Sequence, residues 1–256
     1  MPEGDTIHRA AARMERALAG KRITGAAIVD GADALVGREV RSVEARGKNL
    51  LVAFDDIWIL HTHMRMTGSW HLYRPAERWL LPRRRAKVLL EVADVVAVCF
   101  DAPIVTLLRA RDAPRVPGLA TLGPDLLAPD FDEARALALL RAEGDTPLGV
   151  AILLQRVVAG VGNIWKSETL FARRADPFAR VSAYDDEELL AILRTARALL
   201  QESVAGATRT FGETRAPCVY RRRGRPCRRC GTEIAMRRQG ELARSTYYCP
   251  RCQPAR

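Results

Sequence analysis

Several common features are missing from this 256-residue sequence, and each absence narrows the class of protein. No run of about 20 apolar residues is present, so we expect no membrane-spanning helix. The start lacks the basic-then-apolar pattern of a secretory signal, which leads us to expect a cytoplasmic protein. Internal repeats and low-complexity tracts are absent, and the hydrophobic fraction of 48% excludes wholesale disorder. The length favours two domains, each with its own core.

Acidic residues are too few to balance the basic ones. The 41 lysines and arginines exceed the 30 acids, which gives a net charge of +11 and an isoelectric point near 10.0. Proteins this basic usually bind a polyanion, and nucleic acid is a better candidate than an anionic membrane surface. Arginine supplies most of the positive charge and lysine is scarce. Each lysine is therefore worth considering as a functional residue.

The six cysteines are too few for a disulfide scaffold in a protein of this size. Four of them form two Cys-x2-Cys pairs, which are Cys227 with Cys230 and Cys249 with Cys252. This spacing predicts a structural zinc site that is closed by four thiolates. A rubredoxin-like iron centre is the alternative, and the basic character of the segment disfavours it. Cys99 is expected in a buried strand.

The amino terminus carries an unusual chemical group. A methionine that precedes proline is normally removed, so Pro2 is expected to begin the mature chain with a free secondary amine. Terminal amines have pKa values of about 7.7–8.0, which leaves a nucleophilic fraction near neutral pH. Glu3 stands beside this amine and is suited to proton transfer. The alternative is an ordinary, unstructured start.

Periodicity divides the chain into an α+β sequence of elements. Residues 5–19 have helical spacing, with Asp5 or Thr6 as possible caps and Gly20 as the end. Short apolar runs then predict strands of a sandwich or barrel, at residues 23–29, 39–45, 50–54, 57–60, 87–92 and 95–100. Helices are expected at residues 132–142, 147–159, 163–173 and 185–204, followed by two strands near 232–236 and 246–248.

Other polar motifs are ambiguous when each is considered alone. Gly160-x-Gly162-Asn163 could bring backbone N–H groups to a phosphate or simply cap a helix. Lys48, in a predicted hairpin turn, could be solvated or could contact a phosphate. Arg244 could be one more solvated arginine or could enter a groove beside phosphates. His61 and His63 share a strand face without a third ligand, which favours a structural role.

Together, these motifs resemble the formamidopyrimidine-DNA glycosylase and endonuclease VIII family. The matching segments follow the family order along the whole chain: Met1-Pro2-Glu3-Gly4, Gly47-Lys48-Asn49-Leu50-Leu51, His63-Met64-Arg65-Met66-Thr67-Gly68, Leu122-Gly123-Pro124-Asp125, Gly160-Val161-Gly162-Asn163-Ile164-Trp165, Val219-Tyr220, and the finger from Cys227 to Cys230 and from Arg244 to Gln253.

The resemblance implies a multi-domain α+β fold. A β-sandwich with flanking helices would occupy residues 1–115, and a linker would occupy residues 116–130. A helix–two-turns–helix domain would follow at 131–212, and a β-hairpin zinc finger at 217–256. The finger would bind one structural Zn2+ through Cys227, Cys230, Cys249 and Cys252.

The resemblance also implies roles for individual residues. Pro2 would attack C1′ of a damaged nucleotide that is flipped out of the duplex, and Glu3 would move protons. Lys48, Asn163 and Arg244 would hold the phosphates that flank the lesion, and Lys48 and Arg244 would belong to the catalytic set. Met66 would fill the space that the flipped nucleotide leaves.

The implied function is a bifunctional DNA glycosylase and AP lyase of base excision repair, which cleaves the strand by β,δ-elimination. Its partner would be damaged DNA, with no membrane and no small-molecule cofactor, and the protein would be a monomer at the bacterial nucleoid in the cytoplasm.

Two departures from the family pattern bear on the substrate. The Pro-Glu-Gly opening and the lack of an Arg-Phe pair near residues 101–105 favour the endonuclease VIII branch and oxidised pyrimidines. Thr6 replaces a second glutamate of many members. The alternatives are a non-catalytic zinc protein that binds damaged or abasic DNA and, more remotely, an RNA-associated zinc protein.

Overall fold

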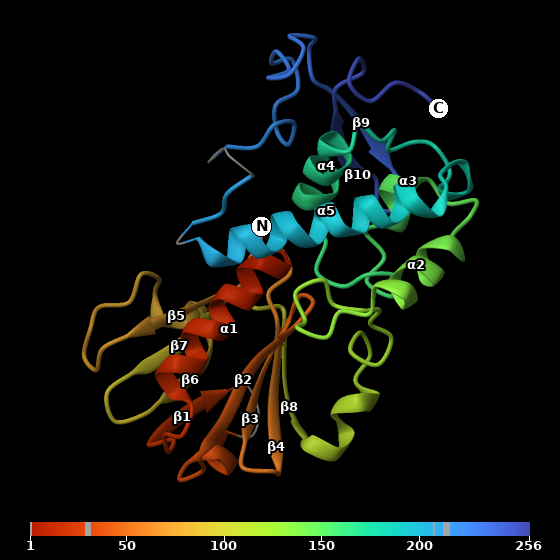
Figure 1. Cartoon of the computed structure of the whole chain (residues 1–256). Coiled ribbons are helices and arrows are strands. Elements are labelled where there is room, and N and C mark those ends of the chain that lie inside the picture. Colours follow the sequence, from red (N-terminus) through yellow and green to blue (C-terminus); the bar gives the residue numbers. More distant parts are fainter. Residues whose placement is uncertain (1, 29–31, 207, 212–215) are drawn as a thin grey trace. The chain divides into compact units, whose positions relative to one another are not determined.

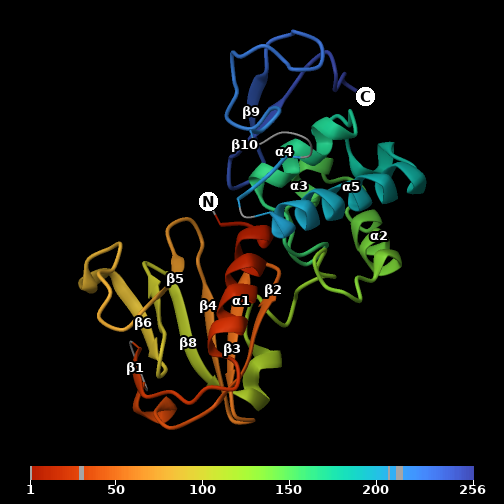
Figure 2. The same cartoon turned by 60° about the vertical axis from the view of Figure 1, so that its left-hand side comes forward.

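The computed structural model describes residues 2–28, 32–206, 208–211 and 216–256, and Figures 1 and 2 show the chain from two sides. The chain divides into two compact units. The first comprises Thr6–Ala120 together with Pro2, and the second comprises Glu3–Asp5 and Thr121–Arg256.

A sandwich of two four-stranded antiparallel sheets forms the first unit. One sheet has the order β1-β6-β7-β5 and the other the order β2-β3-β4-β8. Their bounds are β1 Gly25–Ile28, β2 Val40–Arg46, β3 Asn49–Phe54, β4 Trp58–His63, β5 Ser69–Tyr73, β6 Ala86–Glu91, β7 Val96–Phe100 and β8 Ile104–Arg109. Short 3-10 helices connect or follow the strands at Ala32–Leu35, Arg83–Arg85 and Ala110–Arg115.

Helix α1 (Gly4–Leu18) covers the core of the sandwich. Ile7, Ala11, Met14 and Leu18 recur on one face and are buried with residues of both sheets. Figure 2 shows α1 running alongside the strands. The predicted cap was wrong, because the helix begins at Gly4 and Asp5 therefore lies inside its first turn.

Over the residues that the structure describes from Thr121 onward, the second unit contains four α-helices and a hairpin. The helices are α2 (Glu133–Arg141), α3 (Leu148–Ala151), α4 (Asn163–Ala172) and α5 (Asp186–Ala205), with a 3-10 turn at Val181–Ala183. Asp132 caps α2, and a capping box of Asp185 and Glu188 opens α5. Trp165 and the apolar faces of α2 and α5 share one core.

The predicted helix at 147–159 was wrong in length, because α3 ends at Ala151. The Gln155 side chain explains why the backbone can turn here. Its amide donates to the carbonyls of Leu153 and Val161 and accepts from Gly160 N–H. These bonds satisfy backbone groups that a continuous helix would have paired, and the resulting turns lead directly into α4.

The β-hairpin comprises β9 (Ala235–Gln239) and β10 (Arg244–Tyr248), paired antiparallel. The first strand begins three residues later than the expected 232–236, and the turn at residues 240–243 contains Gly240 and Ala243, which adopt positive φ angles of 65° and 47°. The predicted fold class is nevertheless confirmed, because a β-sandwich, a helical domain and a zinc-finger hairpin are all present. Within the described ranges, no helix has the length and apolarity needed to cross a membrane.

Candidate functional site

The Glu3 carboxylate caps helix α4 from a distant part of the sequence. Glu3 is 1% exposed, and its Oε1 and Oε2 accept hydrogen bonds from the backbone N–H groups of Ile164 (2.8 Å) and Trp165 (3.2 Å). These N–H groups would otherwise lack intrahelical partners, and the positive end of a helix favours a negative charge. The residue next to the candidate nucleophile Pro2 is therefore fixed in position.

The glycines of the Gly160-x-Gly162 turn make this approach possible. A Cβ atom on Gly162 would lie 2.2 Å from Glu3 Cδ, so any side chain there would displace the carboxylate. Gly160 has a φ angle of +104°, and its carbonyl accepts from Gly4 N–H at 2.9 Å. The N–H groups of Ile164 and Trp165 bond Glu3, so a phosphate contact at this helix start stays a prediction for other groups, such as the Asn163 side chain.

Asn163 and Lys166 connect α4 to the hairpin that carries Arg244. Asn163 Nδ2 donates to the Ser245 carbonyl at 2.7 Å, and Lys166 Nζ donates to the same oxygen at 3.3 Å and to Thr246 Oγ1 at 2.7 Å. Lys166 is fully buried, and burial lowers its pKa to about 7. Arg244, which adjoins Ser245, is exposed at the start of β10.

The carboxylate of Glu168 holds the segment that leads into the finger. It accepts hydrogen bonds from the backbone N–H groups of Cys218, Val219 and Tyr220 at 2.7–3.0 Å. Glu168 is 4% exposed, and burial raises its pKa while the three donors oppose that shift. Cys218, for which the sequence suggested no role, contributes its backbone N–H to this arrangement.

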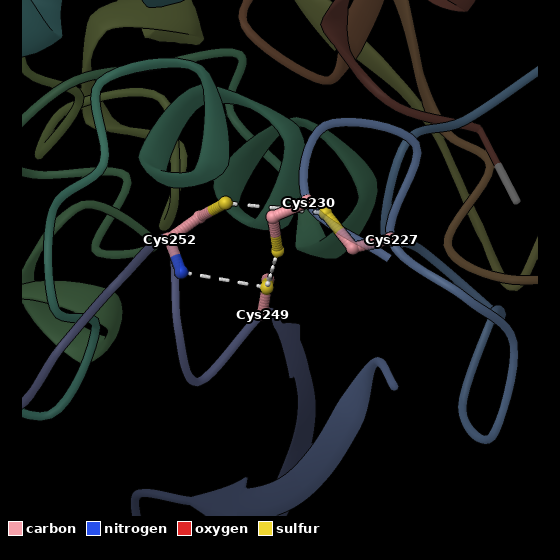
Figure 3. A group of neighbouring side chains, drawn as sticks. All are labelled: Cys227, Cys230, Cys249 and Cys252. Carbon is pink, nitrogen blue, oxygen red and sulfur yellow. Dashed lines mark hydrogen bonds between the residues drawn. The ribbon is translucent and has the colours of Figure 1, made fainter. Parts of the chain in front are cut away.

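The four cysteines of the two Cys-x2-Cys pairs converge on one point, as Figure 3 shows. Their sulfur atoms all lie within 4.8 Å of one another, with Cys227–Cys252 at 4.0 Å and Cys230–Cys249 at 3.5 Å. Tetrahedral Zn–S bonds of about 2.3 Å place sulfur atoms about 3.8 Å apart, so the cluster fits one structural zinc ion without an open position. Zinc would tie the segment before β9 to the segment after β10 and so close the open end of the hairpin.

Two further candidates lie on turns of the sandwich, one within a hairpin and one between the two sheets. Lys48 is half-buried in the β2–β3 turn, where Gly47 adopts the positive φ angle of 58° that a tight hairpin requires. Met66, in the turn between β4 and β5, exposes 58% of its surface. Pro2 belongs to the same unit and is half-buried.

His61 and His63 behave as structural residues. His61 Nε2 lies 2.9 Å from Asn49 Oδ1, and burial lowers the pKa of His61 to about 4. His63 Nδ1 accepts from the backbone N–H of Arg65 at 3.1 Å, which orders the start of the turn that carries Met66.

Comparison with known proteins identifies the family to which this site belongs. Residues 1–103 match the formamidopyrimidine-DNA glycosylase N-terminal domain, residues 122–213 its H2TH domain, and residues 224–255 the zinc finger found in FPG and IleRS. The DNA-(apurinic or apyrimidinic site) lyase Nei2 of Mycolicibacterium smegmatis is 39% identical over 100% of both chains. The chain belongs to the formamidopyrimidine-DNA glycosylase and endonuclease VIII family.

Other members agree with this assignment in sequence and in fold. Endonuclease 8 2 of Mycobacterium tuberculosis is 38% identical, covering 99% of this chain and 100% of the relative. The structure of Lactococcus lactis formamidopyrimidine-DNA glycosylase, solved with DNA that contains an AP site, shares the fold with a TM-score of 0.85 and 21% identity. It covers 99% of this chain and 100% of that one.

For a member of this family, the structure separates the predicted residues into two groups. Glu3, Asn163 and the hairpin that carries Arg244 come together in the second unit, whereas Pro2, Lys48 and Met66 belong to the first. Sequence reasoning missed Lys166, although the scarcity of lysine marked it for inspection. It also missed Glu168 and the buried Asp5 carboxylate, for which local sequence offered no signal.

Proposed function

We propose that this chain is a bifunctional DNA glycosylase and AP lyase of base excision repair, and that the Pro2 nitrogen is its nucleophile. The observation that carries the proposal is the placement of Glu3. Its carboxylate directly follows Pro2 in the chain and is fixed on two N–H groups of α4. A carboxylate that is immobilised beside an amine is suited to accept and return protons during attack on a sugar carbon.

The proposed reaction starts at the Pro2 nitrogen. The Pro2 amine attacks C1′, the bond from C1′ to the damaged base breaks, and the base leaves with a proton. The C1′–O4′ bond then breaks and O4′ takes a proton, which opens the sugar ring and leaves a double bond between C1′ and the Pro2 nitrogen. The resulting iminium ion withdraws electrons, so the C2′ proton is lost to a base and the C3′–oxygen bond breaks, which releases the 3′ phosphate. A second elimination releases the 5′ phosphate. Glu3 carries the protons between the amine and the sugar.

The remaining predicted residues bind and shape the DNA. Lys48, Asn163 and Arg244 hold phosphates beside the lesion, and Met66, whose exposure supports contact with the duplex, fills the vacated space. Asn163 Nδ2 carries two N–H groups, of which one donates to the Ser245 carbonyl and the other is the donor for a phosphate. Zinc takes no chemical part and supports the hairpin that carries Arg244.

The finer features of the proposal follow the family resemblance. Oxidised pyrimidines and abasic sites are the favoured substrates, and the protein works as a monomer at the bacterial nucleoid without a small-molecule cofactor. We assign the sandwich to residues 1–115, the linker to 116–130, the helix–two-turns–helix domain to 131–212 and the finger to 217–256.

Reductive trapping tests the proposed function. Borohydride reduces an iminium ion to a stable amine, so incubation with an abasic duplex is expected to yield a covalent protein–DNA adduct. Pro2→Gly is expected to lose most of this adduct while it retains zinc and DNA affinity. Mass spectrometry of the intact protein establishes whether Met1 has been removed.

The same experiment discriminates between the alternatives. Binding to abasic DNA without an adduct or strand scission, by a protein whose amino terminus is Pro2, would refute the enzyme and support a non-catalytic binder. A panel of duplexes with single lesions, read as strand cleavage on a gel, then ranks thymine glycol, 5-hydroxycytosine and 8-oxoguanine.

A further inference from the structure

Asp5 is a buried carboxylate with an unusually complete set of partners. Its side chain is 0% exposed, and it accepts two parallel hydrogen bonds from Arg209, Nε to Oδ2 and Nη2 to Oδ1, both at 2.7 Å. Ser203 Oγ, on helix α5, donates to Oδ2 at 2.8 Å. Such bidentate arginine–carboxylate contacts fix geometry as well as charge.

Neither the helix nor the core requires this arrangement. Asp5 lies in the first turn of α1, where an exposed acid would favour the helix equally well. Buried ion pairs contribute little net stability compared with well-packed apolar residues, because both charges must be desolvated. A buried ion pair can instead select one geometry, and the Asp5–Arg209 pair does so for the residues next to it in the chain.

The three residues that follow Pro2 each bond another part of the second unit. Glu3 binds the first turn of α4, Gly4 N–H donates to the Gly160 carbonyl at 2.9 Å, and Asp5 binds Ser203 of α5 together with Arg209. The first two attachments lie on one turn, residues 160–165. The third lies on a different element, and it prevents residues 3–5 from rotating about the first two.

Arg209 is held from a second side, which makes the third attachment rigid. Its guanidinium lies 5.8 Å from the centroid of the Trp165 ring, and Trp165 also supplies one of the N–H groups that bind Glu3. Burial acts to raise the pKa of Asp5, but the hydrogen bond and charge of Arg209 outweigh it, so the pKa is lowered overall. Both partners therefore stay charged at neutral pH.

We propose that Asp5, Arg209 and Ser203 are positioning residues that fix Glu3–Asp5 on α4 and α5, so that the adjoining Pro2 nitrogen and Glu3 carboxylate keep a reactive geometry. This inference rests on the proposed function and extends it. The three side chains act through residues 2 and 3 and touch no reacting atom. Loss of the third attachment should therefore slow chemistry while leaving DNA affinity largely intact.

Asp5→Asn tests the inference, because it keeps the shape of the side chain but removes its charge. In single-turnover assays on abasic duplex, we expect adduct formation and strand cleavage to slow by about 10- to 100-fold. The dissociation constant for a duplex with a tetrahydrofuran abasic analogue should change by less than about 3-fold. Arg209→Lys, which keeps the charge but loses the bidentate geometry, should give an intermediate rate.

The matched control is another bidentate ion pair of the same unit. Arg194 on α5 binds Glu133 through two contacts of 2.7 Å on the exposed surface, and Glu133→Gln should leave rate and affinity unchanged. Asp5→Asn leaves the largely buried Arg209 without its charged partner, and this can have an effect of its own. Arg209→Gln and the double variant therefore complete a double-mutant cycle that separates the two effects. If the pair acts as one unit, the double variant should be no slower than the slower single variant.

The outcomes separate this inference from the proposed function. A rate per folded molecule that equals wild type in Asp5→Asn and Ser203→Ala would overturn the positioning role, whatever their melting temperatures. A parallel fall of rate and DNA affinity would also overturn it, because the residues would then act on binding. Absence of any adduct with the wild-type protein would instead overturn the proposed function, and the positioning role with it.

Discussion

The sandwich unit and the helical unit hold their candidate functional side chains in different ways. In the sandwich, the buried polar residues within the described ranges are Asn49, His61 and Thr62, and the candidates Lys48 and Met66 lie on turns. The second unit buries many more polar side chains: Glu3, Asp5, Asn163, Lys166, Ser167, Glu168, Thr169, Asp176, Ser203, Thr246 and Gln253.

This difference determines how each unit should respond to mutation. A side chain on a turn borders solvent, where water can replace a lost polar contact, so its functional effect should be separable from stability. A buried network is satisfied as a whole, and losing one member leaves its partners without compensation. Substitutions in the second unit should therefore have larger and more coupled effects than substitutions in the first.

The largest expected effect on the reaction rate comes from Gly162→Ala, because Gly162 packs directly against the Glu3 carboxylate. The new Cβ would lie 2.2 Å from Glu3 Cδ, so the carboxylate must leave the two N–H groups of α4. Loss of a positioned proton carrier predicts that adduct formation slows by about 1,000-fold. Single-turnover trapping on abasic duplex measures this rate.

A second glycine of the same unit provides the control for this prediction. A Cβ on Gly144 would meet Arg141 O at 3.6 Å, which is an ordinary contact, and Gly144→Ala should trap at the wild-type rate. Wild-type trapping by Gly162→Ala would contradict the proposed role of Glu3 and would weaken the contrast between the units.

Zinc removal should produce the next largest effect, again confined to the second unit. A two-stranded hairpin is marginal by itself, and the four thiolates cluster at the two ends of β9–β10. Without the metal, Arg244 loses its fixed position, and we expect the affinity for abasic-analogue duplex to fall by about 100-fold. Fluorescence anisotropy after chelation and in Cys249→Ser measures this loss.

Cys218→Ser is the matched control, because Cys218 lies outside the zinc cluster and its backbone N–H and carbonyl, which bond Glu168 and Arg222, are unchanged by the substitution. It should retain one zinc per chain and normal affinity. Retention of full zinc content by Cys249→Ser would contradict the four-cysteine site.

A smaller effect is expected for Lys48→Ala on the sandwich. The side chain lies on a two-residue turn, so its removal should leave the melting temperature unchanged. Loss of one phosphate contact should weaken DNA binding by about 10-fold and reduce the slope of log affinity against log salt by about 1. Lys21→Ala, whose lysine is paired with Asp94 at 2.8 Å, is the control and should preserve the slope. An unchanged slope in Lys48→Ala would remove Lys48 from the phosphate-binding set.

The same contrast explains which parts of the fold could be predicted from the sequence. Local signals located α2 and α5, because their caps and apolar periodicity are adjacent in the chain, and they located α4 through the Gly160-x-Gly162 turn that precedes it. They also located most of the central strands. Strands β5 and β8 are not among the predicted strands, and both lie at a sheet edge, where half-exposed residues weaken the apolar pattern. The end of α3 depends on side-chain bonds of Gln155 and has no compositional signal.

The sequence predicted the candidate site as separate residues and not as a network. Family motifs named Pro2, Glu3, Lys48, Asn163 and Arg244, and cysteine spacing named the zinc ligands. The partners of Glu3 lie 161 and 162 residues away in sequence, and those of Asp5 lie 198 and 204 residues away. Only the tertiary structure brings such pairs together, so neither the capping of α4 nor the Asp5–Arg209 pair could be read from local patterns.

The smallest expected effect is a pH dependence of stability in the sandwich unit, where a buried polar pair also occurs. Burial lowers the pKa of His61 from 6.5 to about 4, so the folded state stays neutral while the unfolded chain binds a proton below pH 6.5. The contribution of His61 is therefore complete above pH 6.5 and is lost as pH falls from 6.5 towards 4. We expect His61 to account for about 1 kcal/mol of the stability lost between pH 7.5 and 5.5, allowing for solvent screening.

His61→Gln can still donate to Asn49 but does not titrate, so its urea unfolding should depend less on pH across this interval. An identical pH dependence in the variant and the wild type would show that the sandwich gains no pH sensitivity from its buried histidine, and buried polar groups would then affect only the second unit.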